Sequence, residues 1–500
     1  MKSLKLSIKK FSLGLMMISM VGCSGFLDES DQSNFTLDNY FTKPEHATSV
    51  VNSIYQGLLP MTESGFNGAP WMMVEFATGL AKTELGQAQF SLFVRDLVNN
   101  SDNGYGQTIW TSYYRGIANA NLAISKVPTI TMDEARKQRL IGEAKFLRAY
   151  YYFNLVNIFG NIPLITEPVD LASKDLYASP AAPEDVYNQV VKDLIEAEGT
   201  GLPAIDATGR VSSGAVKSLL SSVYLTMAGY PLQKGTEYYK KAADKAKEVI
   251  DSKAFSLFTS YYDLHNPSKK NLGENIFMAQ FTPFILPSTW QVSIVPYNRG
   301  ISAYSSETGG IFAQEGFIRS HEANDKRVRE KEFYYTKYTL RSDRTKELAL
   351  GDYYIFKHFD ELANLTTTSS GMNWPIMRYA EVLLIFAEAS NEVNGPNSQA
   401  YEAVNSIRKR AELPDLASLS KDELREAVWR EKWFELSYEN KTWFDMVRIR
   451  KAFNVTTRKF DAFVGHKFVY GPVLKERELL FPIPTAEIRN NTNLVQNPGY

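Results

Sequence analysis

The chain has 500 residues, of which 44% are hydrophobic, 22% charged and 13% aromatic, a composition typical of folded globular proteins. It contains 55 Lys and Arg against 56 Asp and Glu, so it has no basic field to attract nucleic acid, and we expect no nucleic-acid partner. The single cysteine excludes a disulfide framework and any cysteine-rich zinc or iron–sulfur site.

The first 22 residues have the pattern of a bacterial signal peptide. Four lysines and no acid lie within residues 1–10, and Phe11–Val21 is an apolar run too short to span a bilayer. The run ends at Gly22-Cys23, which resembles a bacterial lipobox. We therefore predict cleavage before Cys23 and acylation of that cysteine, palmitate included, so that several acyl chains hold the mature chain on a membrane. An ordinary signal peptide with an incidental cysteine is the alternative.

Helical periodicity dominates the chain after a short polar tether at residues 24–36. The expected helices, in chain order, span residues 38–58, 110–127, 142–159, 212–229, 236–252, 378–393, 398–411 and 421–451. Residues 212–252 and 378–411 each form a pair of helices across a short turn, and each pair is close to the roughly 34 residues of a tetratricopeptide (TPR) unit. The pattern predicts an all-α protein built from TPR-like helical hairpins.

Three regions interrupt the helical pattern, namely residues 62–107, 279–310 and 357–375. Long loops in a compact helical protein are usually functional or disordered, and the aromatic content of the first two argues against disorder. Exposed rings beside Asn, Gln, Ser and Arg suit a sugar, whose apolar face stacks while its hydroxyls form hydrogen bonds. The candidate ligand-binding residues are Trp71, Phe90, Tyr105, Trp290, Tyr297 and Tyr304. Packing of a given ring beneath its loop is the alternative.

Catalytic motifs are missing from the sequence. The five histidines are scattered, with no two at zinc-ligand spacing, and there is no nucleophile elbow, dinucleotide loop or phosphate-binding loop. We therefore expect a non-enzymatic protein without a metal or cofactor. A glycosidase with two carboxylates is the alternative, because its acids can come from distant positions. The nearest candidates lie on helices beside arginines, which favours ion pairs between helices; they are Glu381, Glu388, Glu431, Glu435 and Asp445. Arg148 is expected to pair with a buried acid in the same way.

Five segments resemble the SusD/RagB family of Bacteroidetes outer-membrane lipoproteins. Residues 142–164 (GEAKFLRAYYYFNLVNIFGNIPL) and 377–389 (MRYAEVLLIFAEA) are similar to two family patterns almost throughout. Residues 404–411, 429–448 and 480–500 follow in the family's order, with Lys441 in place of the usual arginine. The resemblance covers residues 23–500 as one SusD-like domain, with an N-terminal half of about 23–225 and a C-terminal half of about 270–500.

This resemblance implies an all-α fold of about four TPR-like helix pairs in a right-handed superhelix, with long ligand-binding loops and minor β elements. It also implies a lipid-anchored protein on the outer surface of the outer membrane. Such a protein binds oligo- or polysaccharide and delivers it to a SusC-like TonB-dependent transporter. Peptide or glycopeptide capture by the same fold and a protein-assembly scaffold are the alternatives. The candidate loops lie outside the matched segments, so no binding residue transfers by position and the ligand stays open.

Overall fold

The computed structural model describes residues 40–63, 69–84, 89–170 and 172–500. Cys23 and the predicted signal peptide lie outside these ranges. Within them, no helix is both long enough and apolar enough to cross a lipid bilayer.

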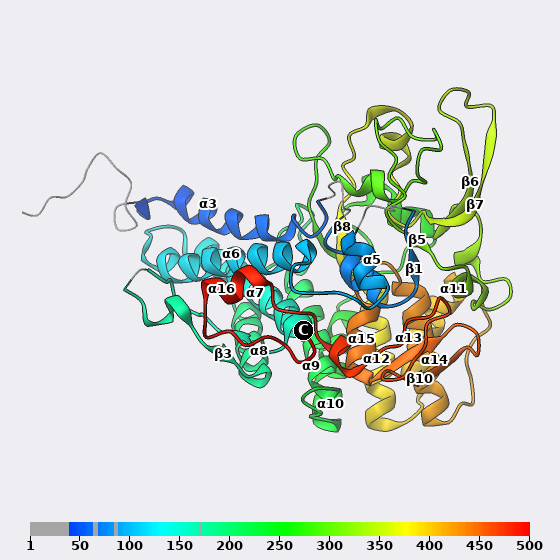
Figure 1. Cartoon of the computed structure of the whole chain (residues 1–500). Coiled ribbons are helices and arrows are strands. Elements are labelled where there is room, and N and C mark those ends of the chain that lie inside the picture. The colour runs from blue at the N-terminus through cyan, green and yellow to red at the C-terminus, as the bar shows by residue number, and fades with distance from the viewer. Residues whose placement is uncertain (1–39, 64–68, 85–88, 171) are drawn as a thin grey trace, which may run out of the picture.

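Pairs of packed helices form the scaffold of the described chain (Figure 1). The pairs are α3 (Pro44–Tyr55) with α6 (Gly104–Lys126), α7 (Glu134–Phe159) with α8 (Pro183–Glu198), α9 (Ser213–Ala228) with α10 (Thr236–Asp251), and α12 (Tyr379–Asn394) with α13 (Ser398–Arg410). Each pair also packs on the next, through α6 on α7, α8 on α9 and α10 on α12. The prediction of an all-α scaffold of TPR-like helix pairs with minor β elements is confirmed.

Six further helices among the described residues complete the scaffold and support its loops. They are α4 (Met72–Ala77), α5 (Gln89–Arg95), α11 (Glu315–Arg319), α14 (Lys421–Leu436), α15 (Thr442–Ile449) and α16 (Thr485–Asn490). Helix α14 is as long as α12, and the others are short. Helix α14 packs on α12 and α13, whereas α15 contacts α4. Through α4 and α15, the N-terminal and C-terminal parts of the described chain therefore contact each other.

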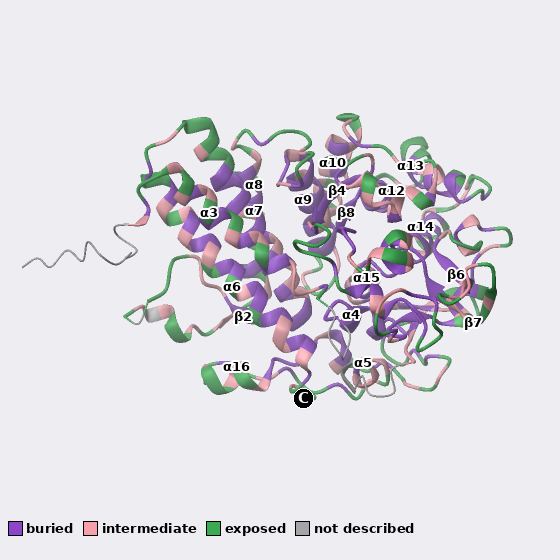
Figure 2. Cartoon of the chain, turned by 90° about the horizontal axis from the view of Figure 1, so that it is seen from above, coloured by how far each residue is buried: buried purple, intermediate pink, exposed green. Residues whose placement is uncertain are grey.

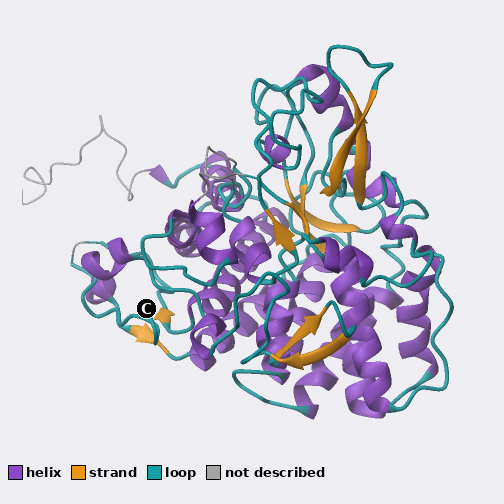
Figure 3. Ribbon diagram, turned by 45° about the vertical axis from the view of Figure 1, so that its right-hand side comes forward, coloured by secondary structure: helices purple, strands orange, loops and turns teal. Residues whose placement is uncertain are grey.

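Small antiparallel sheets stand beside the helices, and the long β6–β7 pair projects from them (Figure 3). The largest has the order β1 (Ala81–Lys82), β5 (Phe312–Ala313), β7 (Glu347–Ile355) and β6 (Tyr334–Thr339). The two-stranded sheets pair β2 (Ile162–Pro163) with β3 (Pro180–Ala181), β4 (Asn275–Ala279) with β8 (Trp374–Arg378), and β9 (Lys451–Asn454) with β10 (Lys459–Ala462). Ala81 lies opposite Ala313, so this sheet joins the first loop region to the strand that directly follows the second.

Side-chain caps set where the first long helices begin. Helix α6 begins at Gly104, earlier than predicted, because the Asn103 side chain accepts a hydrogen bond from the Tyr105 amide at 2.9 Å. Helix α7 likewise begins at Glu134, where the Asp133 carboxylate accepts from the Arg136 amide at 2.8 Å. As predicted, it ends before Gly160, whose φ of 73° favours glycine.

The helix expected over residues 421–451 is two helices, α14 and α15. Tyr438 and Asn440 between them adopt φ angles of 63° and 58°, which an α-helix does not accommodate. Their amides donate hydrogen bonds to the Glu75 carboxylate, at 3.2 and 2.6 Å. A contact with α4 therefore stabilises the break.

One apolar core runs from the helix pairs into the sheets, as the buried residues in Figure 2 show. At the crossing of α6 and α7, the Tyr113 and Tyr151 rings stack with centroids 5.1 Å apart. A Cβ atom at Gly116 would come within 2.3 Å of the Tyr151 ring, so only glycine allows this close approach.

Candidate functional site

The two aromatic loop regions meet through buried tryptophans. Trp71 is the residue immediately before α4, and Trp290 is the first residue of the short helix η7 (Trp290–Ser293). Both contact Trp374 of β8, with ring centroids 4.7 Å and 5.5 Å apart. The His358 ring stacks on Trp374 with centroids 4.5 Å apart and also lies 6.3 Å from the Trp71 ring. We call Trp71, Trp290, His358 and Trp374 the tryptophan cluster; it lies beneath the loops.

The predicted exposure of Trp71 and Trp290 is wrong, because both side chains are 0% exposed. Large rings remove much apolar area from water when they pack together, and edge-to-face contacts add to that gain. Tyr105 is also buried and lies in the first turn of α6, not in a loop. Phe90 belongs to α5, but its side chain lies outside the described part of the structure.

A second group of rings lies at the surface. Tyr297 is 51% exposed and Phe284 is 75% exposed. Ile285 and Leu286 beside Phe284 are exposed as well, and Tyr304 is half-buried. We call these five residues the loop rim. Sequence reasoning placed Phe284 in the second aromatic region but did not select it, although its flanking prolines indicate a projecting turn.

Two carboxylates, the buried Glu307 and the half-buried Glu84, hold the backbone of the rim in place. Glu307 accepts hydrogen bonds from the amides of Gly300 and Ser302, at 2.6 and 2.5 Å. The Tyr297 amide donates to Glu84 at 2.7 Å, which ties this loop to the segment that follows β1. The Tyr297 ring is therefore presented by an ordered backbone.

The third predicted loop region, residues 357–375, is hydrogen-bonded to the second, residues 279–310. The Phe284 amide donates to the Ser369 hydroxyl at 2.6 Å, and the Ser288 amide donates to the Ser370 carbonyl at 2.9 Å. Tyr304 lies near Asp360 and Ser370, and burial, followed by the charge of Asp360, raises the pKa of its hydroxyl. Phe284 and Tyr304 thus approach the same segment.

The rim is suited to contact and not to bond-breaking chemistry. Tyr297 is followed by the exposed Asn298 and Arg299. Rings of this kind stack on an apolar ligand face, and neighbouring amide and guanidinium groups form hydrogen bonds to hydroxyls. Such a surface is chemically suited to a polyhydroxylated ligand.

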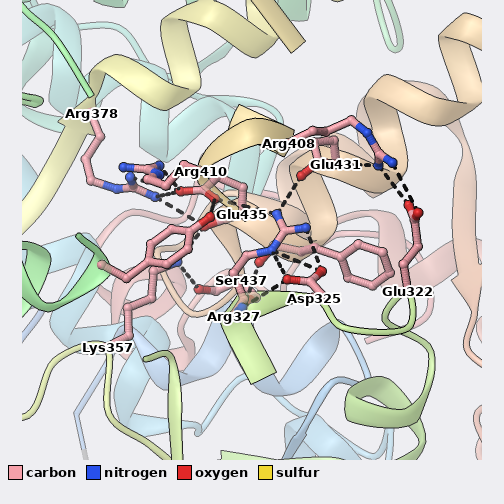
Figure 4. A network of polar contacts seen from close by, with 12 residues as sticks. Glu322, Asp325, Arg327, Lys357, Arg378, Arg408, Arg410, Glu431, Glu435 and Ser437 are labelled. Carbon is pink, nitrogen blue, oxygen red and sulfur yellow. Dashed lines mark hydrogen bonds and ion pairs between the residues drawn. The ribbon is translucent and has the colours of Figure 1, made fainter. Parts of the chain in front are cut away.

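Two of the carboxylates considered for catalysis, Glu431 and Glu435, belong to a buried ion network (Figure 4). Glu435 of α14 contacts Arg410 at 2.7 Å and Arg378 at 3.3 Å. One turn earlier, Glu431 contacts Arg327 at 2.6 Å and Arg408 at 3.2 Å. All these side chains are buried. The interpretation as ion pairs between helices is confirmed for Glu431 and Glu435.

The remaining candidate acids are paired in the same way. Glu388 lies 2.7 Å from Arg448 and 3.0 Å from Lys432. Burial raises the pKa of Glu388, but the charges of Arg448 and Lys432 outweigh burial and lower it to about 2. Arg448 also pairs with Asp445, at 2.6 Å, and Lys441 pairs with Glu381, at 2.8 Å. These acids therefore stabilise helix packing.

Arg148 of α7 meets the expected buried acid on the neighbouring helix. Its guanidinium contacts Asp193 of α8 at 2.7 Å and also donates to the Asn121 side chain of α6 at 2.8 Å. Arg148 thus holds three consecutive helices together, and the prediction is confirmed.

Comparison with known proteins gives matches over most of the chain. Residues 267–500 match the SusD family, and residues 25–225 match the family described as starch-binding associating with outer membrane. A solved SusD superfamily protein from Parabacteroides distasonis is 38% identical with a TM-score of 0.89, covering 93% of this chain and 100% of its own. SusD-like protein P2 of Formosa agariphila is 29% identical over 98% of this chain and 99% of its own. Starch-binding protein SusD of Bacteroides thetaiotaomicron is 23% identical over 77% of this chain and 76% of its own.

Proposed function

The chain belongs to the SusD/RagB family, and from this premise we propose that it is a non-enzymatic glycan-binding protein of the outer-membrane surface. It captures oligo- or polysaccharide and delivers it to a SusC-like TonB-dependent transporter. The observation that carries the proposal is the loop rim, where the exposed Tyr297 ring stands on a backbone fixed by Glu84 and Glu307. The starch-binding name of the Bacteroides thetaiotaomicron relative supports a sugar as the ligand class.

The size of the rim fits weak binding. A sugar face that covers roughly 100 Å² of ring contributes about 2.5 kcal/mol before the entropy of association is subtracted. One ring is therefore insufficient, whereas two or three rings give micromolar to millimolar dissociation constants. Phe284, Tyr297 and Tyr304 supply that number, and repeated contacts along one polysaccharide chain strengthen the binding.

Affinity electrophoresis tests glycan capture directly. The mature chain, residues 23–500 with Cys23→Ala to keep it unacylated, is run through gels that contain plant, host or microbial polysaccharides. We expect at least one class of glycan to retard it relative to a gel without polysaccharide. Unchanged mobility in every gel, together with no heat of binding for short oligosaccharides, would contradict the proposal.

Peptide or glycopeptide capture is the second candidate, and one observation favours it. Phe284, Ile285 and Leu286 form a projecting apolar turn that offers more hydrocarbon than a sugar requires. A peptide panel measured by calorimetry separates the two candidates. Binding of apolar peptides without binding of any glycan would establish the second.

Membrane anchoring through Cys23 is the proposed localisation. In cells, we expect the full chain in the outer-membrane fraction, labelled by palmitate and accessible to antibody at the surface. The Cys23→Ala variant should leave the membrane fraction, while Ser24→Ala should stay there. A Cys23→Ala protein that remains membrane-bound would contradict the lipid anchor. Co-purification of a TonB-dependent transporter with the wild-type chain tests delivery.

A further inference from the structure

A groove of about 300 Å³ lies far from the loop rim, between α6, the turn η4 (Lys174–Tyr177) and α16. Trp110 and Tyr114 of α6 form its floor, and Tyr177 forms part of one rim. Glu487, Asn490 and Asn491 line the other side. We call it the α6–α16 groove. Figures 1 and 2 both show α16 beside α6, on the opposite side of the molecule from β6 and β7.

The groove combines aromatic rings with polar groups. Trp110 and Tyr114 stand one helical turn apart, with ring centroids at 5.0 Å. Tyr177 is 58% exposed, and Asn490 is exposed across the groove. Trp110 is buried and Tyr114 is half-buried, so the exposed Tyr177 ring is the main stacking surface. Amide and carboxylate groups that can accept hydroxyl hydrogens lie within the same small concave surface.

Hydrogen bonds fix both sides of the groove. The Gln107 side chain of α6 donates to Glu487 of α16 at 2.6 Å. The side-chain amides of Asn491 and Asn493 donate to the carbonyls of Ala178 and Tyr177, at 2.8 and 2.7 Å. The C-terminal segment is thus held against both α6 and η4 by hydrogen bonds within the protein. Preformed geometry lowers the entropic cost of binding.

The charge of the lining restricts the class of ligand. Among the described residues that line the groove, Glu487 is the ionisable acid and no Lys or Arg is present. A carboxylate repels phosphate, sulfate and uronate groups but accepts hydrogen bonds from neutral hydroxyls. A volume of about 300 Å³ is at the lower end for small-molecule sites, so the groove suits a short segment of a ligand.

We propose that the α6–α16 groove is a second binding site for a short stretch of neutral glycan, separate from the loop rim. The proposal rests on the glycan-binding function proposed above and extends it. Two sites on opposite parts of one molecule raise the affinity for a long polysaccharide by avidity, because a chain bound at one site stays close to the other.

Single-site variants distinguish the two sites. We propose Tyr177→Ala for the groove, Tyr297→Ala for the rim, and Tyr262→Ala as a control at an exposed tyrosine outside both. The Tyr177 carbonyl that accepts from Asn493 is unchanged by the first substitution. Each protein is the mature chain with Cys23→Ala, run through gels with a neutral polysaccharide that retards the parent.

We expect Tyr177→Ala to weaken retention by about tenfold or more and Tyr262→Ala to leave it unchanged. In calorimetry with a neutral oligosaccharide of that polysaccharide, the stoichiometry should fall from two to one in Tyr177→Ala. If Tyr177→Ala behaves like the parent while Tyr297→Ala loses all binding, the groove proposal fails and the proposed function stands. If no glycan binds the parent, the proposed function fails, and the groove proposal fails with it. Binding of peptide but not of sugar in the groove would also overturn the proposal.

Discussion

Trp290 and Tyr297 lie in one segment of the chain, yet their rings have opposite environments. The Trp290 indole is buried against Trp374, whereas half of the Tyr297 side chain faces solvent. The difference comes from their neighbours: Trp290 meets strand β8 beneath the loop, and Tyr297 follows on a backbone held outward by Glu84 and Glu307. In such an aromatic loop, some rings pack beneath the loop and stabilise it, and only the others can contact a ligand.

The ion pairs show a similar division. Pairs in the network around Glu435 are buried and shared among several arginines, whereas the Arg319–Glu315 pair on α11 is exposed. Removing one partner of a buried ion pair lowers stability strongly, because the remaining charge is shielded from water and stays unpaired. Substitutions in the buried support should therefore destabilise the protein more than substitutions at the exposed surface.

The largest effect is expected for Arg378→Ala. Arg378 binds Glu274 and Glu439, the latter at 2.6 Å, and the substitution leaves both carboxylates buried with fewer partners. We expect the free energy of unfolding in urea to fall by about 3–5 kcal/mol. The matched control Arg319→Ala should change it by less than about 1 kcal/mol. Equal decreases in the free energy of unfolding would contradict the claim that the buried pairs stabilise the fold more than the exposed pair does.

Trp290→Ala is expected to lower the free energy of unfolding by a similar amount, about 3–5 kcal/mol, because it leaves a cavity in the tryptophan cluster. Thermal unfolding monitored by circular dichroism should show a clear decrease in Tm. Tyr297→Ala, measured in parallel, should change Tm little. A Trp290→Ala protein with the wild-type Tm would mean that this ring is not part of the support.

Glu75→Gln tests the buried link between α4 and the break after α14. Burial raises the pKa of Glu75 from 4.5 to about 7, so the folded state holds its proton more tightly than the unfolded chain. The stability from this group is complete below pH 4.5 and is lost as the pH rises through 7, by up to about 3 kcal/mol. The difference in unfolding free energy, variant minus wild type, should therefore increase from pH 4.5 to 7. A difference that stays constant over this range would contradict the account.

The smallest change in stability is expected for Glu307→Ala, which removes the acceptor for the Gly300 and Ser302 amides. We expect a loss of about 1–3 kcal/mol, confined to the loop. Limited proteolysis should cut near residues 297–307 faster than in the wild type, and glycan retention should fall although Tyr297 is intact. Glu347→Ala, at an exposed position on β7, serves as the control. Unchanged proteolysis and glycan retention would show that the Glu307 hydrogen bonds are not needed to hold this loop.

The helical scaffold could be predicted from the sequence because its apolar stripes recur at the helical period. Helices α9, α10, α12 and α13 lie within a residue or two of their predicted bounds. Helix α8 was missed, although Pro183 at its first turn and a stripe that includes Val186 and Val190 were signals for it. Strands of two residues, such as β1 and β5, are too short to show any period.

The candidate site could be located by region but not ring by ring. Aromatic content argued against disorder in residues 62–107 and 279–310. In the described part of the first region, β1 pairs with β5, the strand that directly follows the second region. Whether an individual ring is buried depends on partners far away in the chain, and Trp374 is the common partner of Trp71 and Trp290. That pairing is a property of the tertiary structure, so local patterns do not contain it.

The most direct test of the account is glycan retention and thermal unfolding of Tyr297→Ala, measured on the same preparation. Retention by the polysaccharide that retards the parent should weaken by about tenfold, and Tm should stay within a few degrees of the parent. This result would separate an exposed binding ring from its buried support. Full retention, or a large decrease in Tm, would contradict the assignment of Tyr297 to the ligand-binding surface.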